Sequence, residues 1–166
     1  MNNSIQIFIT GGTFDKSYNY KDGNLYFEKT HLPEMLNRSR CRLNVVFETL
    51  MMIDSLEMNK SHIEKIISKC KTSDSNKIII THGTDRIVQS AKELEKANLL
   101  DKTIILTGAM IPYAFGSSSD GFFNLGCALS FDQSLSNGVY ITMQGQYFSP
   151  NNVKKNKEKG LFEKIN

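Results

Sequence analysis

The sequence predicts an α/β fold: a doubly wound, mainly parallel sheet with helices on both faces. Apolar, strand-like runs alternate along the 166 residues with segments of helical periodicity, which is the order that a parallel sheet requires. The clearest run is Lys77-Ile-Ile-Ile-Thr81, whose three consecutive isoleucines are typical of a strand covered on both faces. Glycines follow several of these runs directly, so the strand ends are where a ligand site is expected.

The first strand, residues 5–9, runs straight into Thr10-Gly-Gly-Thr13. Two glycines allow a sharp turn and a close approach of a ligand, although Thr13 could also simply cap a helix. Residues 14–29 are polar and tyrosine-rich, with Asp22-Gly23-Asn24 as the expected hairpin turn. A segment of this length beside a glycine turn is either an active-site lid or a surface excursion.

Residues 31–40 favour a short helix with Pro33 in its first turn, and residues 43–47 favour the second strand. Residues 59–70 have the periodicity of an amphipathic helix with one apolar stripe, formed by Ile63, Ile66, Ile67 and Cys70. Asp54 and Ser55 lie between that strand and that helix, and on their own they favour an ordinary loop.

The central strand, residues 77–81, ends at Gly83, and Thr84 and Asp85 follow before a helix over residues 87–96. Both side chains therefore lie where a strand becomes a helix, the usual place for a ligand in an open α/β sheet. The alternative is that Thr84 or Asp85 only caps the helix.

Residues 102–108 repeat the pattern of an apolar strand that ends in Thr-Gly, and residues 138–143 supply a fifth strand. Between them, residues 120–131 favour a helix with Asp120 as its cap. Five strands with helices between most of them predict a flavodoxin- or Rossmann-like three-layer sandwich. With no linker or repeat, we expect one domain over residues 1–166.

Composition narrows the function classes. The cysteines are widely spaced and never form C-x-x-C, which indicates neither a disulfide framework nor a zinc site and fits a reducing cytoplasm. No signal-peptide pattern occurs, and no apolar run approaches the roughly 20 residues that span a bilayer. We therefore expect a cytoplasmic protein without a membrane partner.

The net charge of +3 is confined to residues 154–166, where five lysines face two glutamates. The rest of the chain balances at zero and shows no basic stripe, so nucleic acid is not an expected partner. Clustered lysines are usually a solvated surface. A lysine held among other cations can, however, have its pKa lowered and act as a base.

Five motifs, in this order, resemble the bacterial-type L-asparaginase family. They are Thr10-Gly-Gly-Thr13, Thr81-His-Gly-Thr-Asp85, Thr107-Gly-Ala109, Asp120-Gly-x-x-Asn124 and the terminal Val-Lys-Lys. The resemblance covers nearly the whole chain but reaches only the N-terminal domain of the usual two-domain enzymes, and it is greatest to short, single-domain asparaginase-like proteins. The chain departs from the pattern at Arg86, where the family usually has threonine.

The resemblance implies roles for individual residues. Thr13 matches the nucleophilic threonine, and Tyr18, rather than Tyr20 or Tyr26, is the tyrosine expected to assist it. Thr84 matches the second catalytic threonine, with Lys155 as its base, although a shift of one position would make this Lys154. Residues implied in substrate binding are Asp85 for the α-amino group, Ser55 for the α-carboxylate, and also Gly12, Gly83 and Ala109.

The implied reaction is hydrolysis of L-asparagine or a related small amide through an acyl-threonine, without a metal or organic cofactor. A threonine hydroxyl needs a nearby base, and exposed backbone N–H groups at a strand-to-helix turn can stabilise the oxyanion. Two alternatives stay open: a non-catalytic amino-acid binder, and a subunit that supplies ammonia to a larger complex. We expect a homodimer or higher homo-oligomer, because a two-fold pair would most simply complete a site that lacks the second domain.

Overall fold

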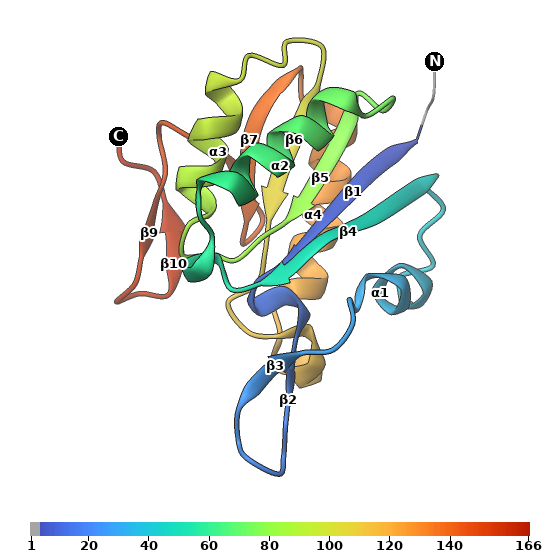
Figure 1. Cartoon of the computed structure of the whole chain (residues 1–166), viewed down its shortest axis with the longest axis vertical. Coiled ribbons are helices and arrows are strands. Elements are labelled where there is room, and N and C mark those ends of the chain that lie inside the picture. The colour runs from blue at the N-terminus through green and yellow to red at the C-terminus, as the bar shows by residue number, and fades with distance from the viewer. Residues whose placement is uncertain (1–3) are drawn as a thin grey trace.

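The computed structural model describes residues 4–166, and a six-stranded sheet forms its centre (Figure 1). The strand order is β4-β1-β5-β6-β7-β8; the first five strands run parallel and β8 is antiparallel to β7. The strands are β1 (Ile5–Gly11), β4 (Val45–Ile53), β5 (Lys77–Thr81), β6 (Thr103–Thr107), β7 (Gly138–Met143) and β8 (Gln146–Phe148). The predicted mainly parallel, doubly wound sheet is confirmed.

Helices cover both faces of the sheet and give it three layers (Figure 1). One apolar core packs α2 (Lys60–Thr72) and α3 (Ile87–Lys96) against one face, and the other packs α1 (Leu32–Arg38) and α4 (Gly121–Ser134) against the opposite face. Neighbouring residues of β5 divide between the two cores, Ile78 and Ile80 in the first and Ile79 in the second. This alternation is why three consecutive isoleucines are all buried.

Local signals account for the helix ends. Pro33 lies in the first turn of α1, where its missing N–H costs nothing. The side chain of Asn59 accepts from the His62 N–H, and the His62 side chain accepts from the Asn59 N–H, which completes a capping box at the start of α2. The predicted stripe of α2 is confirmed, with Ile63, Ile66 and Cys70 buried.

Three parts of the fold differ from the sequence prediction. The second strand begins at Val45 and continues to Ile53, so the predicted range 43–47 is wrong. Beyond the five predicted strands, the short antiparallel strand β8 adds a sixth. The lysine-rich tail forms a hairpin of β9 (Lys154–Asn156) and β10 (Leu161–Glu163) rather than only a solvated surface. Strands of three residues carry too little periodicity to be recognised in a sequence.

Asp120 does not cap α4 as predicted. It stands at the N-cap position without a side-chain capping bond, and its carboxylate accepts from the backbone N–H groups of Met110 and Ile111. Asn124, one turn later, donates to Gly108 O and accepts from the Gln144 N–H. The Asp120-Gly-x-x-Asn124 motif therefore ties the loops after β6 and β7 to α4.

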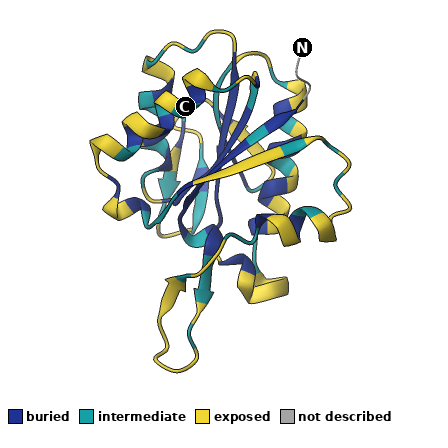
Figure 2. Cartoon of the chain, turned by 45° about the vertical axis from the view of Figure 1, so that its right-hand side comes forward, coloured by how far each residue is buried: buried dark blue, intermediate teal, exposed yellow. Residues whose placement is uncertain are grey.

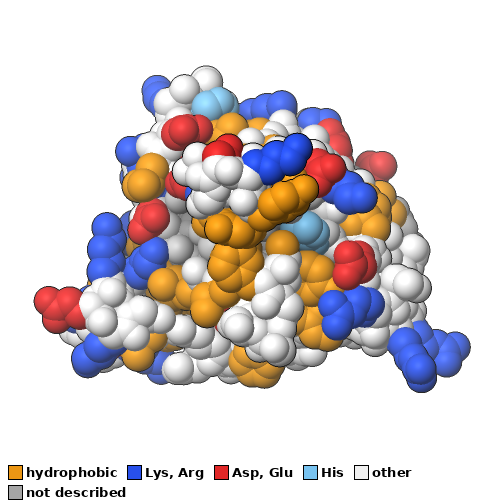
Figure 3. All heavy atoms as spheres, turned by 90° about the horizontal axis from the view of Figure 1, so that it is seen from below, with side chains coloured by type: hydrophobic (Ala, Val, Ile, Leu, Met, Phe, Trp, Pro, Cys, Tyr) orange, Lys and Arg blue, Asp and Glu red, His pale blue; other side chains and the backbone are white. Residues whose placement is uncertain are grey.

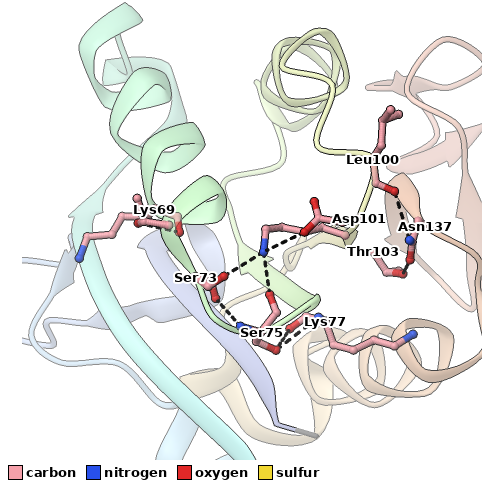
Figure 4. Close-up of polar contacts among 10 residues, drawn as sticks. Lys69, Ser73, Ser75, Lys77, Leu100, Asp101, Thr103 and Asn137 are labelled. Atoms are coloured by element: carbon pink, nitrogen blue, oxygen red, sulfur yellow. Dashed lines mark hydrogen bonds and ion pairs between the residues drawn. The ribbon is translucent and has the colours of Figure 1, made fainter. Parts of the chain in front are cut away.

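Polar contacts join the loops at the end of the sheet where β5 and β6 begin (Figure 4). The buried Lys102 donates to Ser73 O at 2.9 Å and to Ser75 O at 3.1 Å, and it thereby neutralises carbonyl groups at the C-terminal end of α2. Asn137 links to Leu100 O nearby. In residues 4–166 no helix is both long and apolar enough to cross a membrane.

Candidate active site

The candidate site lies at the carboxyl ends of β1, β4 and β5, where three chain segments meet without space for a side chain between them. A Cβ atom on Gly12 would lie 2.4 Å from Gly83 Cα, and one on Gly83 would lie 2.5 Å from Ser55 Oγ. Ser55 is buried, and its Oγ has no hydrogen-bond partner among the described residues. The glycines therefore bring the turns after all three strands into backbone contact.

This contact places two threonines at neighbouring points. Thr13 follows Gly12 and lies in the 3-10 turn η1 (Thr13–Asp15), half-buried. Thr84 follows Gly83 and is buried. Neither is a helix cap: Gly12 stands at the cap position of η1, and α3 is preceded by Arg86 without a side-chain capping bond. The alternatives in which Thr13, Thr84 or Asp85 only caps a helix are wrong.

The terminal hairpin delivers a lysine to this point. Lys155 Nζ lies 2.8 Å from Thr84 Oγ1 and 2.8 Å from Asp85 Oδ1, and its side chain is only 14% exposed. Lys154 points elsewhere, with its Nζ 3.4 Å from Glu163 Oε1. The structure thus brings Thr84, Asp85 and Lys155 together and leaves Lys154 out.

Charged side chains of both signs lie around these residues. Lys16 Nζ pairs with Asp54 Oδ2 at 2.5 Å, and Lys157 Nζ lies 4.0 Å from Asp85 Oδ1, beside the Lys155 contact. Burial alone would raise the pKa of Asp54, but hydrogen bonds from Lys16 and the Leu56 N–H, with the charges of Lys16 and Lys155, hold it below the ordinary value. Figure 3 views this end of the molecule, where charged groups of both signs surround an apolar centre.

Two buried titratable groups, His82 and Asp15, lie in the turns that carry Thr84 and Thr13. Burial lowers the pKa of His82 to about 4, although its hydrogen bond with Gly83 O opposes the shift, so the imidazole is neutral at pH 7. Burial raises the pKa of Asp15, against hydrogen bonds from the His31 N–H and the Thr30 hydroxyl. Asp15 thereby anchors the far end of the 14–29 segment to the turn that carries Thr13.

The tyrosines lie on the exposed hairpin of β2 (Lys16–Tyr18) and β3 (Leu25–Phe27), which projects from the body of the molecule (Figure 2). The Tyr18 ring packs edge-on against Phe115, with 6.2 Å between centroids, and Tyr20 is 81% exposed. Tyr26 Oη lies 3.5 Å from Glu28. The role of Tyr18 beside Thr13 stays a prediction, since its ring contact in this structure is with Phe115.

Ala109 and Arg86 contact other parts of the fold. Ala109 is fully buried, and its side chain faces the start of α4, where a Cβ added at Gly121 would lie 3.4 Å from Ala109 Cβ. Arg86 donates to Met58 O at 2.6 Å, which directs its charge to the start of α2 rather than toward Asp85. Within residues 4–166 no three His, Cys, Asp or Glu side chains are grouped to hold a metal ion.

Sequence reasoning did not identify Lys16, Lys157 or Gly108 as site residues. Lys16 is largely buried and Lys157 is exposed, and the carboxylates that they contact come from distant segments, so no local pattern marks either lysine. Gly108 was visible as a strand-ending glycine: a Cβ there would lie 2.3 Å from His82 O and 3.4 Å from Thr84 Cγ2. Its place at the end of the strand predicted at residues 102–108 was the available signal.

Comparisons with known proteins identify the family of the chain. Residues 4–163 match the family described as Asparaginase, N-terminal. The chain is 32% identical over 167 residues to a probable periplasmic L-asparaginase of Haemophilus influenzae, covering 92% of this chain and 46% of that one. It is 29% identical over 149 residues to one component of a glutamyl-tRNA(Gln) amidotransferase of Thermococcus kodakarensis, covering 86% and 34%. The chain thus spans less than half the length of either relative.

Among solved structures, L-asparaginase I of Vibrio cholerae superposes with a TM-score of 0.84 at 22% identity, covering all of this chain and 52% of that one. At this identity the likeness establishes the fold, a three-layer α/β arrangement, and leaves the chemistry to be argued from the residues.

Proposed function

This chain belongs to the asparaginase family, and from that premise we propose that it is an amidohydrolase that converts L-asparagine, or a related small amide, to L-aspartate and ammonia. The observation that carries the proposal is the contact of Lys155 Nζ with both Thr84 and Asp85, at 2.8 Å each, beside the glycine contact that presents Thr13. A hydroxyl, a base and an acidic anchor are the groups that this reaction requires.

In the proposed reaction the Thr13 hydroxyl attacks the side-chain amide carbon, and backbone N–H groups at the glycine turns stabilise the oxyanion. The hydroxyl proton of Thr13 passes to the leaving nitrogen, the C–N bond breaks and ammonia leaves. An acyl-threonine ester remains. Thr84 and Lys155 transfer protons, and water hydrolyses the ester to release aspartate. Tyr18 assists from the loop that carries Thr13.

Substrate binding is proposed to use the charges of Asp85 and Lys16. The α-ammonium group pairs with Asp85, and the α-carboxylate reaches Ser55, near the positive charge of Lys16. An ammonium at Asp85 would lie beside Lys155, because Lys155 Nζ contacts the same carboxylate at 2.8 Å.

The central test is ammonia release from L-asparagine, L-glutamine and small amides. We expect Thr13→Ala and Lys155→Met each to lower kcat/KM about 100-fold or more, the usual size for loss of a nucleophile or base. Thr72→Ala is the matched control, because the Thr72 hydroxyl is exposed and bonds only within α2. Equal rates for the wild type and Thr13→Ala would remove the proposal.

The free amino acid is the proposed substrate because Asp85 needs an ammonium partner. We expect N-acetyl-L-asparagine to be a much poorer substrate than L-asparagine, and Asp85→Asn to reduce the ratio of the two kcat/KM values. The ratio is the informative quantity, since Asp85 also touches Lys155 and its loss lowers both rates. A ratio unchanged in Asp85→Asn would place the amino group elsewhere.

A second candidate is a non-catalytic amino-acid binder, in which Asp85 and Ser55 would hold the amino acid while Lys155 stays paired with Asp85 at 2.8 Å. Calorimetry would then show binding of L-aspartate without turnover, surviving in Lys155→Met. A third, suggested by the amidotransferase relative, is supply of ammonia to a partner; ammonia release that requires a co-purifying protein would favour it.

A further inference from the structure

The strand β4 is the longest of the sheet and lies at its edge, yet it is built like an interior strand. Its side chains alternate between the faces, and apolar groups are exposed on both: Val46 is 50% exposed and Phe47 is 42% exposed. Figure 2 shows this strand as a long exposed band in front of a buried sheet. Apolar residues on both faces are typical of a strand whose sheet is covered on both faces, yet Val46 and Phe47 of β4 are left about half exposed.

The backbone of β4 also presents bonding groups outward. The Ile5 N–H donates to Asn44 O at 2.8 Å, and Ile5 lies opposite Val45 in the parallel ladder with β1. Because such ladders alternate, the N–H and C=O groups of Val45, Phe47 and Thr49 point away from β1. No backbone partner for them occurs in the described residues. A row of open groups on a long edge is a template for another strand.

The devices that usually protect an edge are weak here. There is no proline in Val45–Ile53, and the only charged residue, Glu48, is paired with Lys69 of α2 at 2.6 Å. Lys65 of α2 covers only the carbonyl of Leu50. The opposite edge, β8, is three residues long. Among the two edges of this sheet, β4 is therefore the one fitted to pair.

Charge at the two ends of β4 points to an antiparallel partner of the same sequence. Arg40 and Arg42 precede the strand, and Asp54 and Glu57 follow it. In an antiparallel pair the basic end of each strand meets the acidic end of the other, whereas a parallel pair would set like charges together. A two-fold axis at Phe47 pairs Val45 with Thr49 and sets Val46, not a second Glu48, opposite Glu48.

We propose that β4 pairs with β4 of a second copy of this chain, antiparallel and centred on Phe47, so that two six-stranded sheets join into one continuous sheet. Open backbone groups and half-exposed apolar side chains are then satisfied together. The pairing also sets the partner's Arg42 opposite Met52, close to the Asp54–Ser55 turn. This surface is independent of the proposed hydrolysis and can be tested without an activity assay.

The first test is the mass in solution, by sedimentation or light scattering. The wild type is expected at twice the 18.8 kDa of one chain, and Phe47→Lys at 18.8 kDa, because two lysines would meet on the axis. Thr49→Pro, which removes an outward N–H of the edge strand, is the second variant and is also expected at 18.8 kDa. Phe123→Lys replaces a comparably exposed phenylalanine of α4 and should remain dimeric. Circular dichroism confirms that each variant is folded.

The second test locates the axis. On mild oxidation Phe47→Cys should form a covalent dimer, while Lys96→Cys, exposed on α3, and the wild type with its native cysteines should not. A wild type that stays monomeric up to about 100 µM, far above the micromolar Kd of a weak dimer, would overturn the proposal. So would a Phe47→Lys dimer, a Phe123→Lys monomer, or equal cross-linking of the two cysteine variants.

Discussion

At the scale of single residues, the candidate site depends on atoms that are absent. Gly83 has no room for a methyl group, because a Cβ built on it would lie 2.5 Å from Ser55 Oγ and 2.6 Å from Ser55 Cβ. The same residue joins the central strand to Thr84. Its missing side chain therefore determines both how closely the turns pack and where the Thr84 hydroxyl is presented.

We expect Gly83→Ala to lower ammonia release at least about 100-fold, as misplacement of reacting groups by about 1 Å can do. Overpacking should also cost about 1–3 kcal/mol in the free energy of unfolding. Gly126→Ala is the control, since a Cβ there meets nothing within 4 Å and a helix gains about 0.5–1 kcal/mol from this change. Urea titration and the ammonia assay measure the two effects; an active Gly83→Ala would contradict the packing argument.

A second residue, Asp132 of α4, makes stability depend on pH. It is fully buried, neither carboxylate oxygen has a hydrogen-bond partner among the described residues, and burial raises its pKa to about 7, against the charge of Lys77 and the nearby Ile78 N–H. Between the ordinary value of 3.8 and about 7 the unfolded chain loses this proton and the folded chain keeps it. Stability therefore falls as pH rises through this window.

Asp132→Asn removes the penalty. The variant should gain stability relative to the wild type as pH rises from 4 to 7, by roughly 3 kcal/mol, and little further gain is expected above about pH 8. Urea unfolding at pH 5 and pH 8 measures it, with the exposed Asp74→Asn as control. A difference between Asp132→Asn and wild type that is independent of pH would show that the carboxyl does not titrate in this range.

At the scale of elements, the terminal hairpin is decisive, because β9 carries Lys155 to a threonine 71 positions earlier in the chain. Its hold on the sheet passes through Gln144, in the turn after β7. That side chain donates to Gly160 O at 3.1 Å and accepts from the Phe162 N–H at 2.9 Å. This amide thus links the hairpin to the sheet, in addition to the packing of Phe162 in the core.

Gln144→Leu keeps a side chain of similar bulk but removes both bonds. We expect faster amide hydrogen exchange in residues 154–163 and a fall in kcat/KM of up to about 100-fold through loss of Lys155 positioning. Gln133→Leu, whose amide bonds only to Leu129 O of its own helix, should change neither. Unchanged exchange in the Gln144 variant would assign the positioning of the hairpin to Val153 and Phe162 in the core instead.

At the scale of the whole molecule, the sheet is closed unequally. Helices cover its faces and Lys102 neutralises carbonyls at its amino end, but the edge strand β4 stays open. A stable dimer through that edge would couple folding to association, because only the folded chain presents the strand.

The unfolding temperature of the wild type should therefore rise with protein concentration, and that of Phe47→Lys should not. Differential scanning calorimetry over a hundredfold range of concentration measures this. If the unfolding temperatures of the two proteins depended on concentration in the same way, stability would not be coupled to association at β4.

Much of the fold could be predicted from sequence because its signals are local. The isoleucine run of β5, the periodicity of α2 and α3 and the glycines at strand ends each occupy a few consecutive residues, and burial gives each a distinct pattern. Short or edge elements lack that signal: β4 extends beyond its apolar start, and β8, β9 and β10 are too short to show a period.

By itself, then, the sequence determined the layered α/β class, the order of the main elements and which residue types stand at the strand ends. Only the tertiary structure decided which of them meet: that Lys155 rather than Lys154 reaches Thr84, that Asp120 bonds a loop rather than capping its helix, and that Lys16 pairs with Asp54. The physical reason is range. Burial and helix capping leave patterns within a few consecutive residues of the sequence. These contacts, in contrast, form only after distant segments pack.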